Sequence, residues 1–545
     1  MATKKSDSFI VQAGILAAAG FVTKIIGTLY RTPLTAIIGN EGNGYYGAAY
    51  YVYLIILTVA SYSMPTAISK IISGYLAGKQ YRNAQRVLKC AFIYVTVAGI
   101  IASIVLFFGA ELFLEPNSAV VLRVFAPTIV IYGYLGVLRG YFQAHRTMVQ
   151  TSISQILEQI LNAFVSVFGA YFLTNMVKDA DATKKAIYGA CGSALGTGSG
   201  VLIALLFMVG MYFLNRNIIR KRVARDTTHE LESYKVIFKG LLCIVTPIII
   251  ASCIYNMNTV VNQTVFVKIL MKLKDFTEAG ASKLYGVYSG RVVVIANIPV
   301  AIGAAMSSAM IPTVSSLFAK GDLDSINLKI RDGIKATMLV SIPAAVGLCV
   351  LAEPIMLLLQ PEREYFPLAV SLLRYMSITV IFYQISTISN GVLQGIGKVN
   401  IPVINSAVAL IAQTILIIPL LIYTDLGTYT LVIATVFYTV LISMLNQFSV
   451  RRHTGYRQEV IKTFIAPLVS AGLMGVMAWL VYDAILMLKL HYCIGLFAAM
   501  VVAVPVYFIA VMKVAGVTED EIKKLPKGRL LARVAKKLHL IKTVD

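Results

Sequence analysis

The stretch TKIIGTLYRTPL, residues 23–34, lies in the first long apolar segment of the chain and carries two cations, Lys24 and Arg31. No acidic residue stands between them, and the next one along the chain is Glu41. Positions seven apart differ by about 20° around a helix of 3.6 residues per turn, so both cations share one face. A charged side chain inside a membrane is costly and usually faces a cavity or a partner. The stretch therefore predicts a membrane helix whose cationic face lines a cavity.

Composition places the whole chain in a membrane. Of 545 residues, 58% are hydrophobic and 13% are charged, and the mean hydropathy is +0.78. Soluble domains carry about 25% charged residues. Many apolar runs reach the roughly 20 residues that cross a bilayer as a helix, and the alternating pattern of a membrane barrel is absent. We therefore expect an all-α integral membrane protein, with the first apolar run, from Phe9, retained rather than cleaved.

The apolar runs predict about fourteen transmembrane helices. We expect two six-helix lobes related by pseudo-two-fold symmetry, followed by an extra C-terminal helix pair. The expected helices are 9–38, 45–77, 87–109, 118–143, 150–173, 187–213, 240–267, 284–318, 336–352, 367–393, 400–423, 428–450, 463–482 and 492–512.

Short internal repeats support the two lobes. GVLRG (136–140) in the fourth expected helix matches GVLQG (391–395) in the tenth, and MPTAIS (64–69) matches IPTVS (311–315). Lobes with an even number of helices are parallel repeats, related by an axis along the membrane normal. The expected organisation is an N-terminal lobe 1–213, a basic loop 214–239, a C-terminal lobe 240–453, the extra pair 454–514 and a basic amphipathic tail 515–545.

The 48 Lys and Arg residues predict the topology. Most of them fall on the cytoplasmic side if the N-terminus is cytoplasmic, which also places the C-terminus inside. Segment 268–283 fits worst, because its four lysines lie on the predicted outer side, and a misplaced helix boundary would explain it. The tail combines a cationic face with an apolar stripe and is expected to bind the anionic inner leaflet. A nucleic-acid role for the tail is the less favoured interpretation.

Seven basic residues and a single acid, Glu158, fall within the expected spans. Glu158 can neutralise one cation at most. Arg123, Arg139 and Arg374 lie near helix ends, where snorkelling to the membrane interface is expected. The seven basic residues are Lys24, Arg31, Lys70, Arg123, Arg139, Arg291 and Arg374.

Depth distinguishes the remaining cations. Lys24, Arg31 and Arg291 lie deeper in their helices and are predicted to line a cavity, whereas the position of Lys70 leaves the question open. In the seventh expected helix, Asn258 and Asn262 share one face at i and i+4. They either line the pathway or bond neighbouring helices.

The sequence contains no enzyme or metal motif. The six cysteines show no C-x-x-C spacing, and H-E-x-x-H, the phosphate-binding loop and G-x-S-x-G are absent. A membrane polymerase or glycosyltransferase would need organised carboxylates, and the expected external acids form no such motif; these are Glu111, Glu115, Glu362 and Glu364. We expect neither an enzyme nor a bound metal or cofactor.

A cavity with several cations and almost no anions is suited to an anionic substrate, and Arg in particular to phosphate. A lipid-linked diphosphate fits, because its head could occupy the cavity while its tail stays in the bilayer. A drug-cation exporter would instead require acids in the cavity.

Four motifs carry a resemblance to a known family. They are TKIIGTLYRTPL, SMPTAISKIISGYLAGK (63–79), GVLRGYFQAHRTM (136–148) and YSGRVVVIANIPVAIGAAMSSAMIPTVS (288–315). The chain resembles the polysaccharide-transport branch of the MOP exporter superfamily, in particular the lipid II flippases and stage V sporulation protein B-like proteins of Gram-positive bacteria. This resemblance implies two six-helix lobes, a lipid-tail groove at the extra pair, and alternating access in the bacterial plasma membrane.

The resemblance implies that Lys24, Arg31 and Arg291 bind the diphosphate of an undecaprenyl-linked saccharide, with Lys70 and Arg374 as weaker candidates. Tyr288, Asn258, Asn262 and Glu158 are candidates for lining the pathway. Gram-negative members have Arg in place of Lys24, and an acid early in the second helix where this chain reads GYYGAAY (44–50). No coupling ion is therefore assigned, and the membrane potential is an alternative energy source.

We expect a flippase for the peptidoglycan precursor lipid II, in contact with membrane lipids and with cell-wall synthesis proteins as candidate partners. The alternatives are a flippase for a capsule, teichoic-acid-type or spore-cortex unit and, less favoured, a MATE-like cation antiporter.

Overall fold

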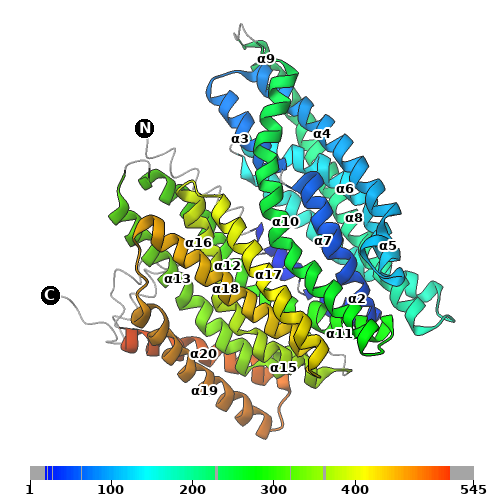
Figure 1. Ribbon diagram of the computed structural model, residues 1–545, viewed down its shortest axis with the longest axis vertical. Helices are drawn as coiled ribbons and strands as arrows, with labels where there is room; N and C mark the ends of the chain where they lie inside the picture. The colour runs from blue at the N-terminus through cyan, green and yellow to red at the C-terminus, as the bar shows by residue number, and fades with distance from the viewer. Residues whose placement is uncertain are drawn as a thin grey trace. The chain divides into compact units, whose positions relative to one another are not determined.

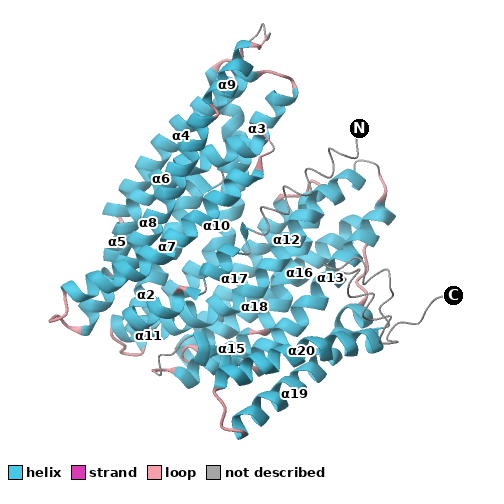
Figure 2. Ribbon diagram, turned by 180° about the vertical axis from the view of Figure 1, so that it is seen from behind, coloured by secondary structure: helices cyan, strands magenta, loops and turns pink. Residues whose placement is uncertain are grey.

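A computed structural model describes residues 19–20, 22–27, 29–62, 64–145, 147–226, 231–318, 321–359 and 364–515. All regular structure in these residues is helical, which confirms the expected all-α class (Figure 2). Residues 9–18, 21 and 28 of the first expected helix and residues 516–545 of the tail lie outside the described residues.

The helices follow the expected order, with some shifted ends and added breaks. They are α2 (Arg31–Leu57), α3 (Met64–Ala77), α4 (Tyr81–Phe108), α5 (Ala110–Phe113), α6 (Pro116–Ala144), α7 (Met148–Met176), α8 (Ala182–Leu214), α9 (Arg216–Ala224), α10 (Tyr234–Leu273), α11 (Glu278–Gly286), α12 (Val293–Phe318), α13 (Leu323–Val350), α14 (Ala352–Leu359), α15 (Phe366–Met376), α16 (Ile378–Gly395), α17 (Asn400–Tyr423), α18 (Tyr429–Thr454), α19 (Ala466–Met487) and α20 (Tyr492–Ala515), with π-helical segments η1 (Thr58–Tyr62), η2 (Val287–Val292) and η3 (Ile461–Ile465).

Ten helices in the described part of the chain are long and apolar enough to cross a membrane, or eleven if α15 and α16 form one bent span. The sequence predicts one helix over 367–393, but the structure bends it by 40° between α15 and α16. The Ser377 hydroxyl donates to the Arg374 carbonyl at 2.7 Å, and such back-bonding commonly bends helices.

The chain divides into two compact units. Unit 1 comprises Met1–Gly290 with Ile418–Thr428, and unit 2 comprises Arg291–Ile417 with Tyr429–Asp545. The lobe boundaries expected from the sequence, at 213 and 240, stay a prediction.

In unit 1, α6 packs against α3, α4 and α8, and α7 runs along α8 (Figure 1). The α7–α8 contact is made by small residues. A Cβ at Gly192 would lie 2.4 Å from the Gly169 carbonyl carbon, and one at Gly200 would lie 2.5 Å from the Glu158 carbonyl oxygen. Membrane helices associate through such close packing, because lipid provides no hydrophobic drive between them.

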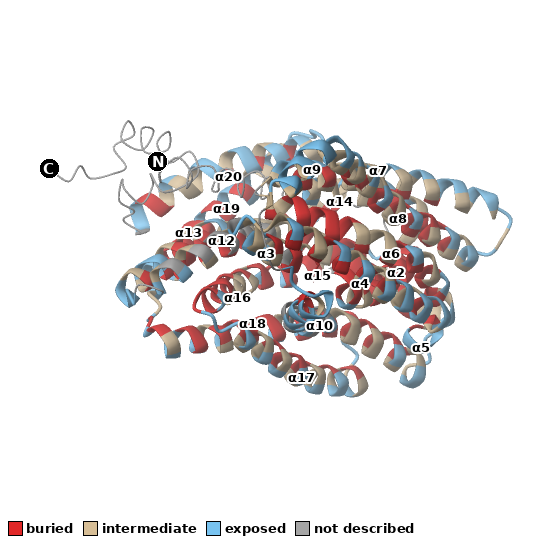
Figure 3. Ribbon diagram, turned by 90° about the horizontal axis from the view of Figure 1, so that it is seen from above, coloured by how far each residue is buried: buried red, intermediate tan, exposed pale blue. Residues whose placement is uncertain are grey.

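The outer face of α7 is exposed (Figure 3). It carries a stack of three phenylalanines: Phe164 and Phe168 lie 6.1 Å apart between ring centroids, and Phe168 and Phe172 lie 6.4 Å apart. Exposed apolar side chains on a helix of this hydropathy are suited to contact with lipid.

Residues 39–44 correct an expectation. The sequence GNEGNG predicts a loop, but the structure confines the break to Gly39, whose φ of 65° and ψ of −175° interrupt α2, and helix resumes directly. The glycines serve packing instead: a Cβ at Gly44 would lie 2.0 Å from the Ser282 carbonyl oxygen, and one at Gly286 would lie 1.9 Å from that of Asn40. The backbones of α2 and α11 are therefore in direct contact.

The boundary problem in segment 268–283 is also corrected. Helix α10 is 40 residues long and continues to Leu273, so Lys268 and Lys272 are helical rather than in a loop. The next residue, Lys274, pairs with Asp425, which follows α17, at 2.7 Å.

In unit 2, α16 packs against α12, α13 and α18, and α19 runs along α20. A buried polar network joins three helices: Asn405 of α17 donates to Asn446 of α18 at 2.9 Å, and Asn446 donates to Ser386 of α16 at 3.1 Å. Interhelical bonds of this kind stabilise membrane bundles.

Candidate functional site

Arg31 is the first residue of α2 and is half-buried in unit 1. Its guanidinium carbon lies 5.1 Å from the centroid of the Tyr46 ring, a cation–π distance. Among the described residues, the structure gives Arg31 no ion pair and no hydrogen bond. Four tyrosines lie near its guanidinium: Tyr30, Tyr46, Tyr50 and Tyr51.

The aromatic surroundings of Arg31 come from the following part of α2. Tyr46 is 1% exposed, its ring stacks with Tyr50 at 5.7 Å and 12°, and its hydroxyl lies 3.3 Å from the Thr197 hydroxyl. Phe125 of α6 lies behind it, at 5.8 Å between ring centroids. The guanidinium is therefore attracted by a ring face that competes for none of its N–H donors.

The other predicted cations of unit 1 are more exposed. Lys24 and Lys70 are both exposed, Lys70 on α3. Lys24 and Lys70 therefore differ from Arg31, which is half-buried against the Tyr46 ring.

Arg291 lies in unit 2, in η2, and is fully buried at 0% exposure. Its Nη1 donates to the Glu364 carbonyl oxygen at 3.3 Å. π-Helical segments inside helices are frequent at functional sites. A ligand would reach this guanidinium only after the covering residues have moved. Arg374, on α15 of the same unit, is exposed.

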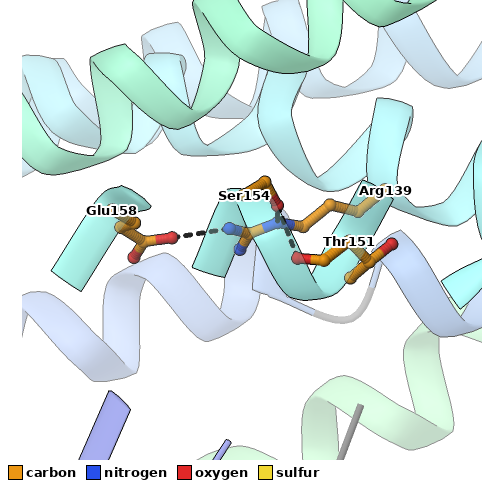
Figure 4. A network of polar contacts seen from close by, with 4 residues as sticks. All are labelled: Arg139, Thr151, Ser154 and Glu158. Atoms are coloured by element: carbon orange, nitrogen blue, oxygen red, sulfur yellow. Dashed lines mark hydrogen bonds and ion pairs between the residues drawn. The ribbon is translucent and has the colours of Figure 1, made fainter. Parts of the chain in front are cut away.

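Arg139 corrects an expectation. Snorkelling was expected, but Arg139 is 5% exposed, and its Nη2 pairs with the Glu158 carboxylate at 2.7 Å (Figure 4). Its Nε donates to the Ser154 hydroxyl at 2.9 Å, which in turn donates to the Thr151 carbonyl at 2.7 Å (Figure 4). The pair joins α6 to α7 and neutralises a charge that could not otherwise stay inside a membrane. The prediction that Glu158 neutralises one cation is confirmed.

Arg123 is placed as its helix-end position predicts. It is half-exposed at the start of α6 and pairs with Glu111 at 2.6 Å.

The remaining candidates are buried in unit 1. Asn258 and Asn262, on α10, are 6% and 3% exposed, and their side chains approach at 3.5 Å. Tyr288, in η2, is 4% exposed and its ring lies 6.1 Å from that of Tyr285.

Glu41, which the sequence places in a loop between two expected helices, is a buried acid in α2. It is 6% exposed and accepts a hydrogen bond from the Tyr45 hydroxyl at 2.9 Å. Asn117 of α6 donates to the same Tyr45 hydroxyl at 3.3 Å. The expectation that Glu158 is the single acid within the spans is therefore wrong, whereas the stretch GYYGAAY (44–50) contains no acid.

Two further acids, Glu278 and Glu115, lie near Glu41 and its hydrogen bond with Tyr45. Glu278, at the start of α11, accepts from backbone N–H groups of Asn117 and Ser118 at the start of α6. Burial raises its pKa, and the charges of Glu115 and Glu41 raise it further. No group of three metal-binding side chains occurs among the described residues.

Taken together, the cations differ in their partners. Arg123, Arg139 and Lys274 are neutralised by carboxylates and Arg291 donates to a backbone carbonyl, whereas Arg31 lies against the Tyr46 ring with no hydrogen bond to a described residue. A half-buried guanidinium placed like that of Arg31 can bind a planar or tetrahedral anion through two parallel hydrogen bonds.

A helical bundle with many spans and cations inside it defines a membrane transport protein, and sequence comparison gives the family. The family model described as "Polysaccharide biosynthesis protein" matches residues 11–318, more than half of the chain, and the model MatE matches residues 289–419. The chain belongs to the polysaccharide biosynthesis protein family, within the MOP superfamily of membrane transporters.

Two relatives from Bacillus subtilis (strain 168) cover most of the chain. "Lipid II flippase MurJ" is 23% identical over 85% of this chain and 86% of its own, and "Stage V sporulation protein B" is 23% identical over 97% and 99%. The membership confirms that the chain is a transporter rather than an enzyme.

Solved structures share the fold. The inward closed conformation of lipid II flippase MurJ matches with a TM-score of 0.66 at 16% identity, over 91% of this chain and 97% of that one. An inward-facing multidrug resistance MATE family transporter matches with a TM-score of 0.64 at 15% identity, over 79% and 94%. At these identities the likeness establishes the fold alone.

Proposed function

We propose that this transporter flips an undecaprenyl-diphosphate-linked saccharide from the inner to the outer leaflet by alternating access, and that its substrate is lipid II. The observation that carries the proposal is the environment of Arg31: a half-buried guanidinium on a tyrosine ring, with no carboxylate pairing it among the described residues. Such a group is prepared for an anion from outside the protein, and the diphosphate supplies one.

Lys24 and Arg291 complete the proposed diphosphate site, with Lys70 and Arg374 as secondary candidates. Arg291 is buried under backbone contacts, so its part begins when the conformational cycle uncovers it. Tyr288, Asn258 and Asn262 are proposed to line the pathway. Glu158 is engaged by Arg139, which makes a structural role the simpler proposal for it.

The proposed architecture is fourteen transmembrane helices with both termini in the cytoplasm of a bacterial cell. It comprises lobes at 1–213 and 240–453, and the pair 454–514 would provide a groove for the lipid tail. Cell-wall synthesis proteins would receive the flipped substrate, and no nucleic acid is involved.

Charge substitution tests the assignment of Arg31. Arg31→Gln and Arg31→Ala should abolish complementation in a host depleted of this protein, while Arg31→Lys should retain part of the activity, all at normal membrane levels. Arg123→Gln is the matched control, because it removes an arginine that already has a carboxylate partner. Full activity of Arg31→Ala would contradict the assignment. The same series at Arg291 should rank Lys above Gln and Ala.

A flippase for a different lipid-linked unit is the second candidate. The alignment with stage V sporulation protein B, which spans 97% of this chain, supports a spore-cortex unit as this second candidate. A MATE-like cation antiporter shares the fold, but a cationic substrate would be repelled by Arg31.

A further inference from the structure

We infer that Tyr46 is a positioning residue for Arg31: the face of its ring holds the guanidinium with its N–H edge free to take a bidentate phosphate ligand. This inference rests on the proposed diphosphate role of Arg31. It adds Tyr46 as the residue that keeps the N–H groups of Arg31 available for a phosphate.

The geometry gives the ring this role. The guanidinium carbon lies 5.1 Å from the Tyr46 centroid, inside the range of a cation–π attraction, and Tyr46 is 1% exposed. The ring cannot turn away from Arg31 easily, because Tyr50 stacks on it and Phe125 packs against it. Since the attraction acts through the π face, all five N–H donors of the guanidinium stay available.

A carboxylate partner would work less well in this place. Arg139 shows the alternative in the same unit, where Glu158 and Ser154 occupy its Nη2 and Nε. A ligand phosphate would have to displace those bonds. An aromatic partner attracts the cation without occupying its hydrogen-bonding edge.

Gly39 makes the contact possible. Residues 31 and 46 are fifteen positions apart, which in a straight helix corresponds to about 22 Å along the axis, beyond the reach of an arginine side chain. The break at Gly39, with φ of 65° and ψ of −175°, lets the first turns of α2 bring Arg31 back to Tyr46. This region of backbone conformation is essentially restricted to glycine.

The test measures binding of farnesyl diphosphate, a short polyprenyl diphosphate, to the purified full-length protein in nanodiscs. Tyr46→Leu should weaken binding about tenfold, the effect expected from losing a partly desolvated cation–π contact. Tyr46→Phe, which keeps the ring, should stay within about twofold of the wild type. Phe142→Leu is the matched control, because it removes a buried α6 ring that packs in a different cluster of unit 1.

A double-mutant cycle that combines Tyr46→Leu with Arg31→Gln separates the cation–π contact from a general packing effect, because packing alone would not make the effect of Tyr46→Leu on binding depend on Arg31. Tyr46→Leu should cost nothing further once Arg31 is neutral. Fluorinated phenylalanines at position 46, which keep the ring shape while weakening its negative face, cover the case in which Tyr46→Leu fails to fold. Binding should fall stepwise with fluorination.

The outcomes separate the two claims. Equal binding by the fluorinated series, or equal losses for Tyr46→Leu and Phe142→Leu, would overturn the role of the ring. Loss of binding in Arg31→Gln together with unchanged binding in Tyr46→Leu would overturn this inference and leave the proposed function standing. Binding by Arg31→Gln at the wild-type level, or none by the wild type, would overturn both.

Discussion

At the scale of single residues, Arg139 and Arg31 differ in the group that each guanidinium contacts. Arg139 and Arg31 both lie in membrane helices of unit 1, but the first is bound to a carboxylate and the second to a ring face. Arg139 has a structural role, because its charge and its N–H donors are used within the protein. Arg31 keeps its N–H donors for a ligand in our proposal, and this difference between the two arginines is the basis of the proposed function.

The Arg139–Glu158 pair predicts a strong non-additive effect on stability. Removing one partner of a buried pair leaves an uncompensated charge and costs about 3–5 kcal/mol. Arg139→Gln and Glu158→Gln should each lower the free energy of unfolding by roughly 3 kcal/mol, because the Glu158 side chain is 24% exposed. The double variant should lose less than the sum of the two, measured by thermal unfolding in detergent. Additive losses would mean that the pair contributes little.

His145 predicts a dependence of stability on pH. It follows the last residue of α6, and burial, aided by the charge of Arg222, lowers its pKa from 6.5, against a backbone hydrogen bond to Tyr141 that raises it. The unfolded chain therefore takes up a proton first as the pH falls, so the contribution of His145 is present above about pH 6.5 and is lost as the pH falls from there toward the lowered pKa. In His145→Gln, the fall in Tm between pH 7 and 5.5 should be smaller than in the wild type, and an unchanged fall would exclude His145 as its source.

At the scale of elements, glycine governs two features of α2. Gly39 breaks the helix, and the glycines after it allow α2 to lie directly on α11. A sequence rich in Gly and Asn is typical of a turn, and here tertiary packing overrides that local preference. Because a loop was predicted over residues 39–44, Glu41 was not counted among the acids inside the membrane helices, although it is buried in α2.

The α2–α11 contact predicts that Gly286→Ala is destabilising. Its new Cβ would lie 1.9 Å from the Asn40 carbonyl oxygen, so the helices would have to separate, at a cost of about 1–3 kcal/mol. Gly74→Ala, in α3, is the control: no atom lies within 4 Å of its Cβ, and alanine favours helix by about 1 kcal/mol. Thermal unfolding should show a lower Tm for the first and an equal or higher Tm for the second. A Tm for Gly286→Ala equal to that of the wild type would show that α2 and α11 can move apart without loss of stability.

Sequence reasoning reached the helical class and the family, because apolar runs and the quoted motifs are local signals. It also identified Arg31 as a deep cation, from its place in the first apolar stretch. It could not find the partners of the arginines. The contact of Arg31 with Tyr46 depends on the backbone break at Gly39, and that of Arg139 with Glu158 depends on how α6 meets α7. Such pairings are set by packing and leave no pattern at a fixed spacing.

At the scale of the whole molecule, the chain is a multi-pass transporter of the MOP superfamily, in which Arg31 lies against the Tyr46 ring. The fold is shared by drug exporters and lipid flippases, so the fold alone does not select the substrate. We propose that charge selects the substrate. A cationic interior would favour an anionic head group, such as that of a lipid-linked diphosphate.

The most direct measurement is the distribution of lipid II between the leaflets of host cells depleted of this protein. Depletion should lower the lipid II accessible at the outer leaflet and raise the inner pool, with wild-type protein restoring the distribution and Arg31→Gln failing to do so. An unchanged distribution in cells without a second flippase would contradict lipid II as the substrate.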